Sequence, residues 1–374
     1  MVHPINTLQS SFDTLSVNGH LWTRNEVMAW TRTELQSLPP CLQELIGFLQ
    51  CWWDETPWME VHTSGSTGVP KRMQVTKEQM IQSAALTCRT LGLQAGQTAL
   101  LCMNLRYIGA MMMVVRALTA RLSLIVREAS GHPLSTVNEA IDFAAMVPLQ
   151  VYNSLEHPQE KQRLSEIRNL IIGGAAIDSE MEARLQTLSG AVYVTYGMTE
   201  TLSHIALRRI NGGEASNFYR PLAGVTVSLS PTDSTLCIHA PHLCNEVIRT
   251  RDVASINPDG SFRIHGRLDN VINSGGIKIQ IEELEQRLRP LLGDGIAVTH
   301  VPDGRLGQAV VLLVAGQGRT LPKPEQLKSQ LPRFHSPAYV LPIEQLPLTP
   351  NGKIDRAACR DYALKATSST LPTN

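Results

Sequence analysis

The segment at residues 63–71, TSGSTGVPK, combines hydroxyl groups, glycine and a final lysine in a pattern suited to binding phosphate. Glycine lets the backbone approach phosphate oxygens closely, and serine and threonine hydroxyls donate hydrogen bonds to them. The segment is not a Walker A loop, because Gly65 and Gly68 are too close together and Pro70 precedes the lysine. It also lacks the G-x-G-x-x-G fingerprint of dinucleotide binding. By itself such a segment is more often a flexible turn. The candidate phosphate-binding residues are Thr63, Ser64, Gly65, Ser66, Thr67, Gly68 and Lys71.

Four later segments could complete a site for nucleotide chemistry. LIIGGA at residues 170–175 is typical of a strand followed by a glycine turn, and YGMTE at 196–200 ends in a carboxylate of the kind that Mg²⁺ prefers. RTRD at 249–252 ends in a carboxylate. PNGK at 350–353 places a lysine on a turn. Each segment alone has an ordinary structural explanation, so their order along the chain carries the argument.

In this order the segments resemble the motifs of the acyl-adenylate-forming superfamily, which includes acyl-CoA synthetases, the adenylation domains of peptide synthetases and firefly luciferase. The resemblance covers residues from about 60 to 360 and extends to GRLD at 266–269 and LTPNGKIDR at 348–356. It implies an enzyme that uses ATP and Mg²⁺ to convert a small carboxylic acid into an acyl adenylate. The acyl group then passes to a thiol, with CoA as the expected co-substrate.

The resemblance also assigns roles to single residues. Thr199 is expected to hold the α-phosphate region, Glu200 to bind Mg²⁺, and Lys353 to lie between the substrate carboxylate and the α-phosphate, which makes these three the expected catalytic residues. Asp252 and Arg267 are expected at the ribose, although Arg251 stands where the family usually has glycine. The remaining residues expected to bind the nucleotide are Gly174, Ala175, Tyr196 and Gly197.

A domain rotation is implied as well. Asp269 matches the family's hinge, and rotation about it would carry Lys353 away while bringing Gly275 and Gly276 toward the second substrate. One site would then serve two reactions in turn.

Alternating strand and helix patterns must position the first motifs. Thr76 and Gln79 form a capping box that opens a helix, and apolar runs predict strands at 99–103, 122–126, 169–172 and 191–195 and helices at 108–120 and 180–188. Short β-type runs fill 225–265, and the last hundred residues predict an α+β unit. The fold class is therefore α/β: a large N-terminal α/β domain with a parallel sheet plus an antiparallel β segment, and a small mobile C-terminal α+β domain. We expect domains at 1–268, with a shortened N-terminal subdomain, and at 269–365, followed by a flexible tail at 366–374.

The bulk composition argues against several other functions. Lys+Arg and Asp+Glu are equal at 33 each, which gives no overall field for holding nucleic acid. The seven cysteines form no C-x-x-C pair, and the longest apolar stretch is short and interrupted by Arg116. With no basic and apolar leader at the N-terminus, we expect a cytoplasmic protein that is not inserted in a membrane. The sequence does not indicate an oligomeric state.

The sequence indicates the identity of the carboxylic acid substrate less clearly. The short N-terminal region and the runs YGMTET and GRLDNVINSGG resemble the o-succinylbenzoate–CoA ligases of menaquinone synthesis. A dicarboxylate would need a cation for its second carboxylate, and Arg106 and Arg116 are candidates, although Arg116 could equally just interrupt a helix face. Tyr107 occupies the position of a histidine found in many relatives near the acyl pocket.

Two alternatives stay open. The first is a stand-alone adenylation enzyme that loads an aryl or amino acid onto a carrier protein. The second is a non-catalytic nucleotide-binding relative, against which the presence of Glu200, Asp252, Arg267 and Lys353 argues.

Overall fold

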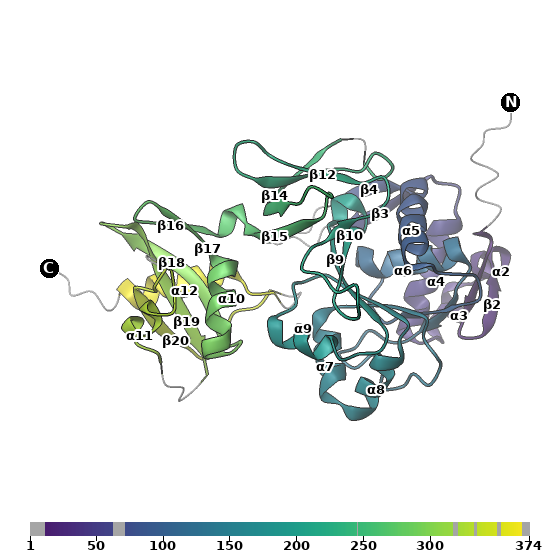
Figure 1. The fold of residues 1–374 in the computed structure, drawn as a ribbon. Coiled ribbons are helices and arrows are strands. Elements are labelled where there is room, and N and C mark those ends of the chain that lie inside the picture. Colours follow the sequence, from purple (N-terminus) through teal and green to yellow (C-terminus); the bar gives the residue numbers. More distant parts are fainter. Residues whose placement is uncertain are drawn as a thin grey trace. The chain divides into compact units, whose positions relative to one another are not determined.

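The computed structural model describes residues 12–62, 72–244, 246–316, 321–332, 335–349 and 353–368. The chain forms two compact units (Figure 1). The first unit comprises Met1–Val227, Ile238–Ile248 and Pro258–Ser261, and the second comprises Ser228–Cys237, Arg249–Asn257 and Phe262–Asn374. The expected phosphate loop at 63–71 lies outside the described residues.

A nine-stranded sheet organises the first unit, in the order β11-β10-β9-β8-β7-β5-β6-β1-β2. The neighbours from β1 to β9 pair in parallel, whereas β1–β2, β9–β10 and β10–β11 pair antiparallel. The strands are β1 Thr14–Val17, β2 His20–Thr23, β5 Thr98–Leu101, β6 Ser123–Val126, β7 Phe143–Met146, β8 Asn169–Ile172, β9 Ala191–Gly197, β10 His204–Arg209 and β11 Arg220–Pro221. A separate hairpin pairs β3 Trp58–His62 with β4 Arg72–Thr76. The predicted parallel sheet is therefore confirmed.

Helices cover both faces of this sheet. They are α2 Arg24–Ala29, α3 Arg32–Gln36, α4 Pro40–Trp53, α5 Lys77–Leu91, α6 Ile108–Ala120, α7 Pro148–Glu156, α8 Pro158–Glu166 and α9 Ser179–Leu185. Figure 1 shows α5 and α6 on one side and α7, α8 and α9 on the other. The predicted capping box is present, with Gln79 N donating to Thr76 Oγ1 and Thr76 N donating to Gln79 Oε1, both at 3.0 Å. None of the described helices is long and apolar enough to cross a membrane.

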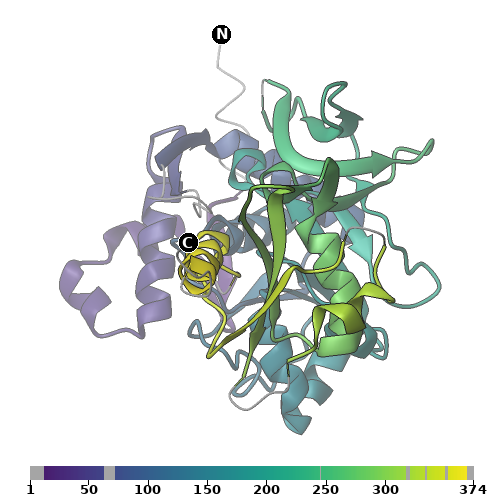
Figure 2. The same cartoon turned by 90° about the vertical axis from the view of Figure 1, so that its left-hand side faces the viewer.

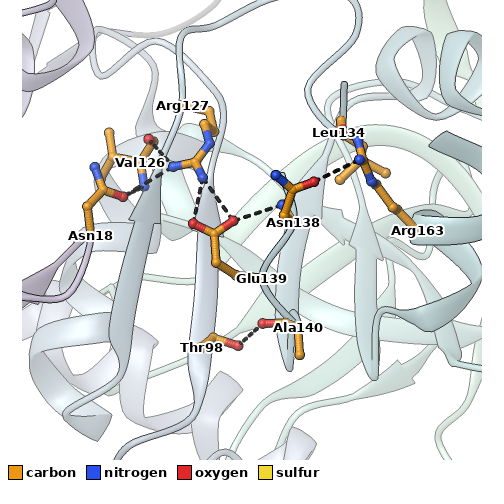
Figure 3. Close-up of polar contacts among 9 residues, drawn as sticks. All are labelled: Asn18, Thr98, Val126, Arg127, Leu134, Asn138, Glu139, Ala140 and Arg163. Carbon is orange, nitrogen blue, oxygen red and sulfur yellow. Dashed lines mark hydrogen bonds and ion pairs between the residues drawn. The ribbon is translucent and has the colours of Figure 1, made fainter. Parts of the chain in front are cut away.

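Polar contacts tie the N-terminal hairpin to the parallel strands (Figure 3). The Asn18 side-chain oxygen accepts a hydrogen bond from Val126 N at 2.9 Å and one from the Arg127 guanidinium at 3.3 Å. Arg127 also donates to both carboxylate oxygens of Glu139, at 2.7 and 2.9 Å. These contacts fix the end of β6, the strand that immediately follows α6.

A four-stranded antiparallel sheet, in the order β12-β13-β14-β15, follows in the chain. Its strands are β12 Thr226–Leu229, β13 Thr235–His239, β14 Ile248–Ile256 and β15 Phe262–Arg267. The register of β14 and β15 places Asp252 directly opposite Arg267. The antiparallel pairing predicted for this segment thus brings together two expected nucleotide-binding residues.

The last part of the second unit is a sheet between two helices (Figure 2). Its elements are β16 Val271–Ser274, β17 Ile277–Gln280, α10 Ile281–Leu292, β18 Ile296–Asp303, β19 Gly307–Ala315, α11 Pro324–Lys328, β20 Tyr339–Ile343 and α12 Arg356–Ser368. Because side chains alternate along a strand, Val298 packs with α10 while its neighbour Ala297 packs with α12. Helix α12 extends to Ser368 and so includes residues 366–368, where the predicted flexible tail begins.

Candidate functional site

The YGMTE segment lies at the carboxyl end of β9, the edge at which α/β sheets bind ligands. A short 3₁₀ turn, η2 at Thr199–Thr201, follows the strand, and Thr201 Oγ1 accepts a hydrogen bond from Met198 N at 3.0 Å. Gly197 has no room for a side chain, because a Cβ there would lie 2.3 Å from the carbonyl oxygen of Ser203. Thr199 is buried, whereas Glu200 is exposed and has no hydrogen-bond or ion-pair partner among the described residues. The turn thus presents a carboxylate available to a cation.

The neighbouring strand β8 ends beside this turn, since Ile172 pairs with Val194 of β9. Gly173 follows, and a Cβ at Gly173 would lie 2.4 Å from Thr195 Oγ1. Gly174 has a φ of +87°, a conformation that favours glycine. The structure therefore brings Gly174 and Ala175 to the same sheet edge as Tyr196 and Gly197.

Arg106 and Tyr107 lie next to each other on the surface. The guanidinium carbon of Arg106 is 5.1 Å from the centroid of the Tyr107 ring, a cation–π arrangement. Tyr107 is the N-cap residue of α6 and is 40% exposed. Both side chains are thus accessible to solvent.

Arg116 lies on the same helix but is 1% exposed. Its guanidinium donates to Ser203 Oγ at 2.5 Å and contacts Met113 Sδ at 3.9 Å, while its Nε has no hydrogen-bond partner among the described residues. Burial lowers the pKa of Arg116 to about 10, so the side chain stays protonated at neutral pH. A full positive charge therefore lies in the core of the first unit.

This charge has no acidic partner among the described residues. The remaining residues cannot provide one from a side chain either, because no Asp or Glu occurs among them. His204 beside it is neutral, since burial and the Arg116 charge hold its pKa well below the usual value. Its Nε2 lies 3.1 Å from Thr87 Oγ1, and its Nδ1 lies 3.3 Å from Ser203 Oγ.

Ser203 and His204 were not among the sequence-predicted site residues. His204 begins β10, the strand after YGMTE, and Ser203 directly precedes it; a serine and a histidine before an apolar run were a usable signal. Since Ser203 contacts Arg116 and its carbonyl faces Gly197, the buried charge lies directly behind the predicted α-phosphate turn.

In the second unit, Asp252 and Arg267 form an ion pair across β14 and β15. Arg267 NH1 is 3.2 Å from Asp252 Oδ1, and Arg267 NH2 is 3.5 Å from Asp269 Oδ2. Asp269 lies in a short 3₁₀ turn, η3 at Leu268–Asn270, and also pairs with Arg251. The residue that replaces the expected glycine thus contacts the predicted hinge.

Lys353 lies in one of two short chain segments that hydrogen-bond to each other. Leu348 and Ile354 form a β-bridge, Thr349 N donates to Lys353 O at 2.7 Å, and Lys353 N donates to Thr349 Oγ1 at 3.2 Å. Surrounding protein atoms lower the pKa of the Lys353 ammonium, Arg267 lowers it further, and Asp252 opposes the shift. Lys353 therefore interacts electrostatically with Asp252 and Arg267, the predicted ribose-binding pair.

Gly275 and Gly276 form the exposed turn between β16 and β17. Their φ angles are +57° and +83°, and Gly275 N donates to Leu306 O at 2.8 Å. Two consecutive residues with positive φ favour glycine, so the turn explains both residues without a ligand.

Replacing Arg251 with glycine tests its contact with the predicted hinge. Both partners are exposed, so the pair is worth at most about 1 kcal/mol and the expected effect is less than about five-fold. In the two-step reaction that the resemblance implies, we expect Arg251→Gly to raise the rate of thioester formation from supplied acyl adenylate, because Asp269 is released, with adenylate formation unchanged. A slower thioester step, measured by rapid-quench kinetics, would argue against this role.

Comparison with known proteins shows to which family the chain belongs. A model of the AMP-binding enzyme family matches residues 49–233. The crystal structure of an acyl-CoA synthetase (AMP-forming)/AMP-acid ligase II-like protein from Dyadobacter fermentans is 32% identical, covers 88% of this chain and 97% of its own, and superposes with a TM-score of 0.60. The chain belongs to the AMP-binding enzyme family.

Three further relatives have lower sequence identities. The 2-succinylbenzoate–CoA ligase of Lactococcus lactis is 24% identical over 322 residues, which cover 81% of this chain and 70% of that protein. The o-succinylbenzoate coenzyme A synthetase of Bacillus subtilis, in complex with ATP and a magnesium ion, is 19% identical with a TM-score of 0.66 and covers 80% of this chain and 68% of its own. Bacitracin synthase 3 of Bacillus licheniformis is 23% identical over 338 residues, which cover 80% of this chain and 5% of that protein. The last match covers a small fraction of a much longer chain.

Proposed function

We propose that this chain activates a dicarboxylic acid with ATP and transfers the acyl group to CoA, with o-succinylbenzoate as the acid and menaquinone synthesis as the pathway. The observation that carries the substrate class is Arg116, a buried guanidinium with no acidic partner among the described residues. Taking a charge out of water costs several kcal/mol unless an opposite charge is nearby. A second carboxylate on the substrate would supply that charge.

The expected chemistry is electrostatic. One carboxylate oxygen of the acid attacks the α-phosphorus of ATP, the bond to pyrophosphate breaks, and an acyl adenylate forms. Both reactants are anions, so positive charge at the site must offset their repulsion. Lys353 has this role in our proposal; its side chain is exposed, while surrounding protein atoms and Arg267 lower its pKa. A thiolate then attacks the acyl carbon, and AMP leaves.

The described residues fit ATP and Mg²⁺. Mg²⁺ in nucleotide sites takes one or two carboxylates and completes its shell with phosphates and water, and the unpartnered carboxylate of Glu200 meets that requirement. The described residues include no cluster of three or more acidic, histidine or cysteine ligands, which a protein-only site would need. When bound, the ion would neutralise charge on the phosphate oxygens. Asp252 and Arg267 would hold the ribose, with the Asp252 carboxylate, which pairs with Arg267, accepting hydrogen bonds from its hydroxyls.

A second candidate is an adenylation enzyme that loads an amino or aryl acid onto a carrier protein. The sequence similarity to bacitracin synthase 3 favours it. Arg116 distinguishes the two, because an apolar amino acid or a simple aryl acid has no second carboxylate to pair with it.

The substrate class can be tested by measuring pyrophosphate release with a panel of acids. We expect o-succinylbenzoate to be turned over and its singly esterified derivative, which lacks the second carboxylate, to be at least 100-fold poorer in kcat/KM, about the cost of leaving a buried charge unpaired. Equal turnover of the acid and its ester would contradict the dicarboxylate assignment. Turnover of an amino acid in preference would support the second candidate.

A further inference from the structure

Glu285 is a buried carboxylate that lies outside every sequence-predicted motif. It is on α10 and is 1% exposed. Its two oxygens accept from the guanidinium of Arg356, at 2.5 and 2.8 Å, and Oε1 also accepts from Val298 N at 2.7 Å. Arg289 approaches the second oxygen at 3.9 Å. The carboxylate thus joins helix α10 and strand β18 to the first residue of α12.

Arg356 is three residues after Lys353, and the intervening chain is held firmly. Asp355 N donates to Pro347 O at 2.9 Å, and Asp355 Oδ1 accepts from Ala358 N at 3.0 Å in the first turn of α12. With the β-bridge between Leu348 and Ile354, the segment 353–355 has contacts on both sides. The Glu285–Arg356 ion pair therefore fixes the first residue of α12, directly after the segment 353–355 that carries Lys353.

From this geometry we propose that Glu285 and Arg356 are positioning residues for Lys353, and that they set the rate of adenylate formation without touching substrate. The inference rests on the proposed function, since it assigns them to the step in which Lys353 acts. A bidentate pair fixes both the distance and the orientation of its partners, which a single contact does not. Glu285, Arg356 and Lys353 all belong to the second unit. Any rotation about Asp269 would therefore leave the ion pair and Lys353 in the same relative positions.

The test separates the two half-reactions in the full-length protein. Glu285→Gln keeps the shape of the side chain but removes its charge, and a displacement of Lys353 by about 1 Å would slow adenylate formation about 10- to 100-fold. Thioester formation from supplied acyl adenylate and CoA should change less than two-fold, because Lys353 is not needed there. That second rate also shows that the variant is folded. Arg356→Lys, which keeps the charge but loses the bidentate geometry, should give an intermediate loss.

Glu325→Gln is the matched control, because it removes the same charge from an exposed position on α11 of the same unit. The rates of adenylate formation and thioester formation in that variant should match those of the parent protein. Equal losses in the two half-reactions of Glu285→Gln, or no loss in either, would overturn the positioning role and leave the pair as a contributor to stability alone.

Hydrogen exchange gives a readout that does not need activity. Peptides that cover residues 346–356 report on the Thr349–Lys353 and Asp355–Pro347 hydrogen bonds directly. We expect faster exchange of these amides in Glu285→Gln and not in Glu325→Gln, whatever acid the enzyme uses. Unchanged exchange would overturn the inference, whereas failure of the parent protein to adenylate any acid would count against the proposed function instead.

Discussion

Replacing Lys353 with alanine is expected to slow acyl-adenylate formation about 100- to 1000-fold, the range seen when one preorganised group that stabilises transition-state charge is removed. ATP binding should be nearly unchanged, because Asp252, Arg267 and Glu200 are retained. Thioester formation from supplied adenylate should also persist. Pyrophosphate release and isothermal titration with ATP measure the two quantities separately.

The pH dependence of the same step gives a second check on Lys353. The ammonium must be protonated to offset anionic charge, and its pKa is below the usual value for lysine because of burial and Arg267. The rate of adenylate formation should therefore fall as pH rises through that lowered pKa, and this limb should be absent in Lys353→Ala. Lys328→Ala, an exposed lysine on α11, serves as the control. Adenylation at the parent rate in Lys353→Ala would remove the residue from the mechanism.

Replacing Arg116 with methionine is expected to lower kcat/KM for o-succinylbenzoate about 100- to 1000-fold, because the second carboxylate loses a charged partner in a buried setting. The singly esterified acid should be turned over as well as by the parent or better. Thermal stability should be unchanged or higher, since methionine relieves an unpaired buried charge and keeps much of the volume. Steady-state kinetics with both acids and a melting curve test all three expectations.

Arg106→Met is the matched comparison for Arg116. Arg106 was the other arginine indicated by the sequence, but it is exposed and lies against Tyr107, so we expect its loss to change kcat/KM less than about five-fold. If Arg116→Met lowered kcat/KM equally for the diacid and the ester, Arg116 would stabilise the fold rather than bind the substrate. A large selective effect in Arg106→Met would assign the second carboxylate to that residue instead.

Local patterns predicted the elements that depend on nearby residues. Helix α6 begins and ends at the predicted residues, because its apolar stretch is long and bounded by a clear change in composition. The Thr76 capping box also forms as expected. Asp178 caps α9, with Met181 N donating to Asp178 Oδ1 at 2.7 Å. Helices α7 and α8 were missed although each begins with proline at its first position, a signal that was present in the sequence.

Features that join distant segments could not be predicted from local patterns. Strand β1 pairs with β6 across more than one hundred residues, and Arg356 meets Glu285 across 71. The sequence left two interpretations of Arg116, a partner for a substrate carboxylate or a residue that interrupts a helix face. Only the structure shows that Arg116 is buried and that its charge lacks an acidic partner within the described residues. The motifs predicted the residue types of the candidate site, whereas only the packing showed that Arg116 is buried, which is the observation on which we propose a diacid.

The most direct test of the central claim is to incubate the purified protein with MgATP, CoA and o-succinylbenzoate and to analyse the products by mass spectrometry. We expect o-succinylbenzoyl-CoA and AMP in equal amounts, with neither formed when ATP or CoA is omitted from the complete reaction. Acyl adenylate and pyrophosphate without a CoA thioester would point to a carrier-protein acceptor. No product with this acid, together with pyrophosphate release for an acid that has a single carboxylate, would contradict the account.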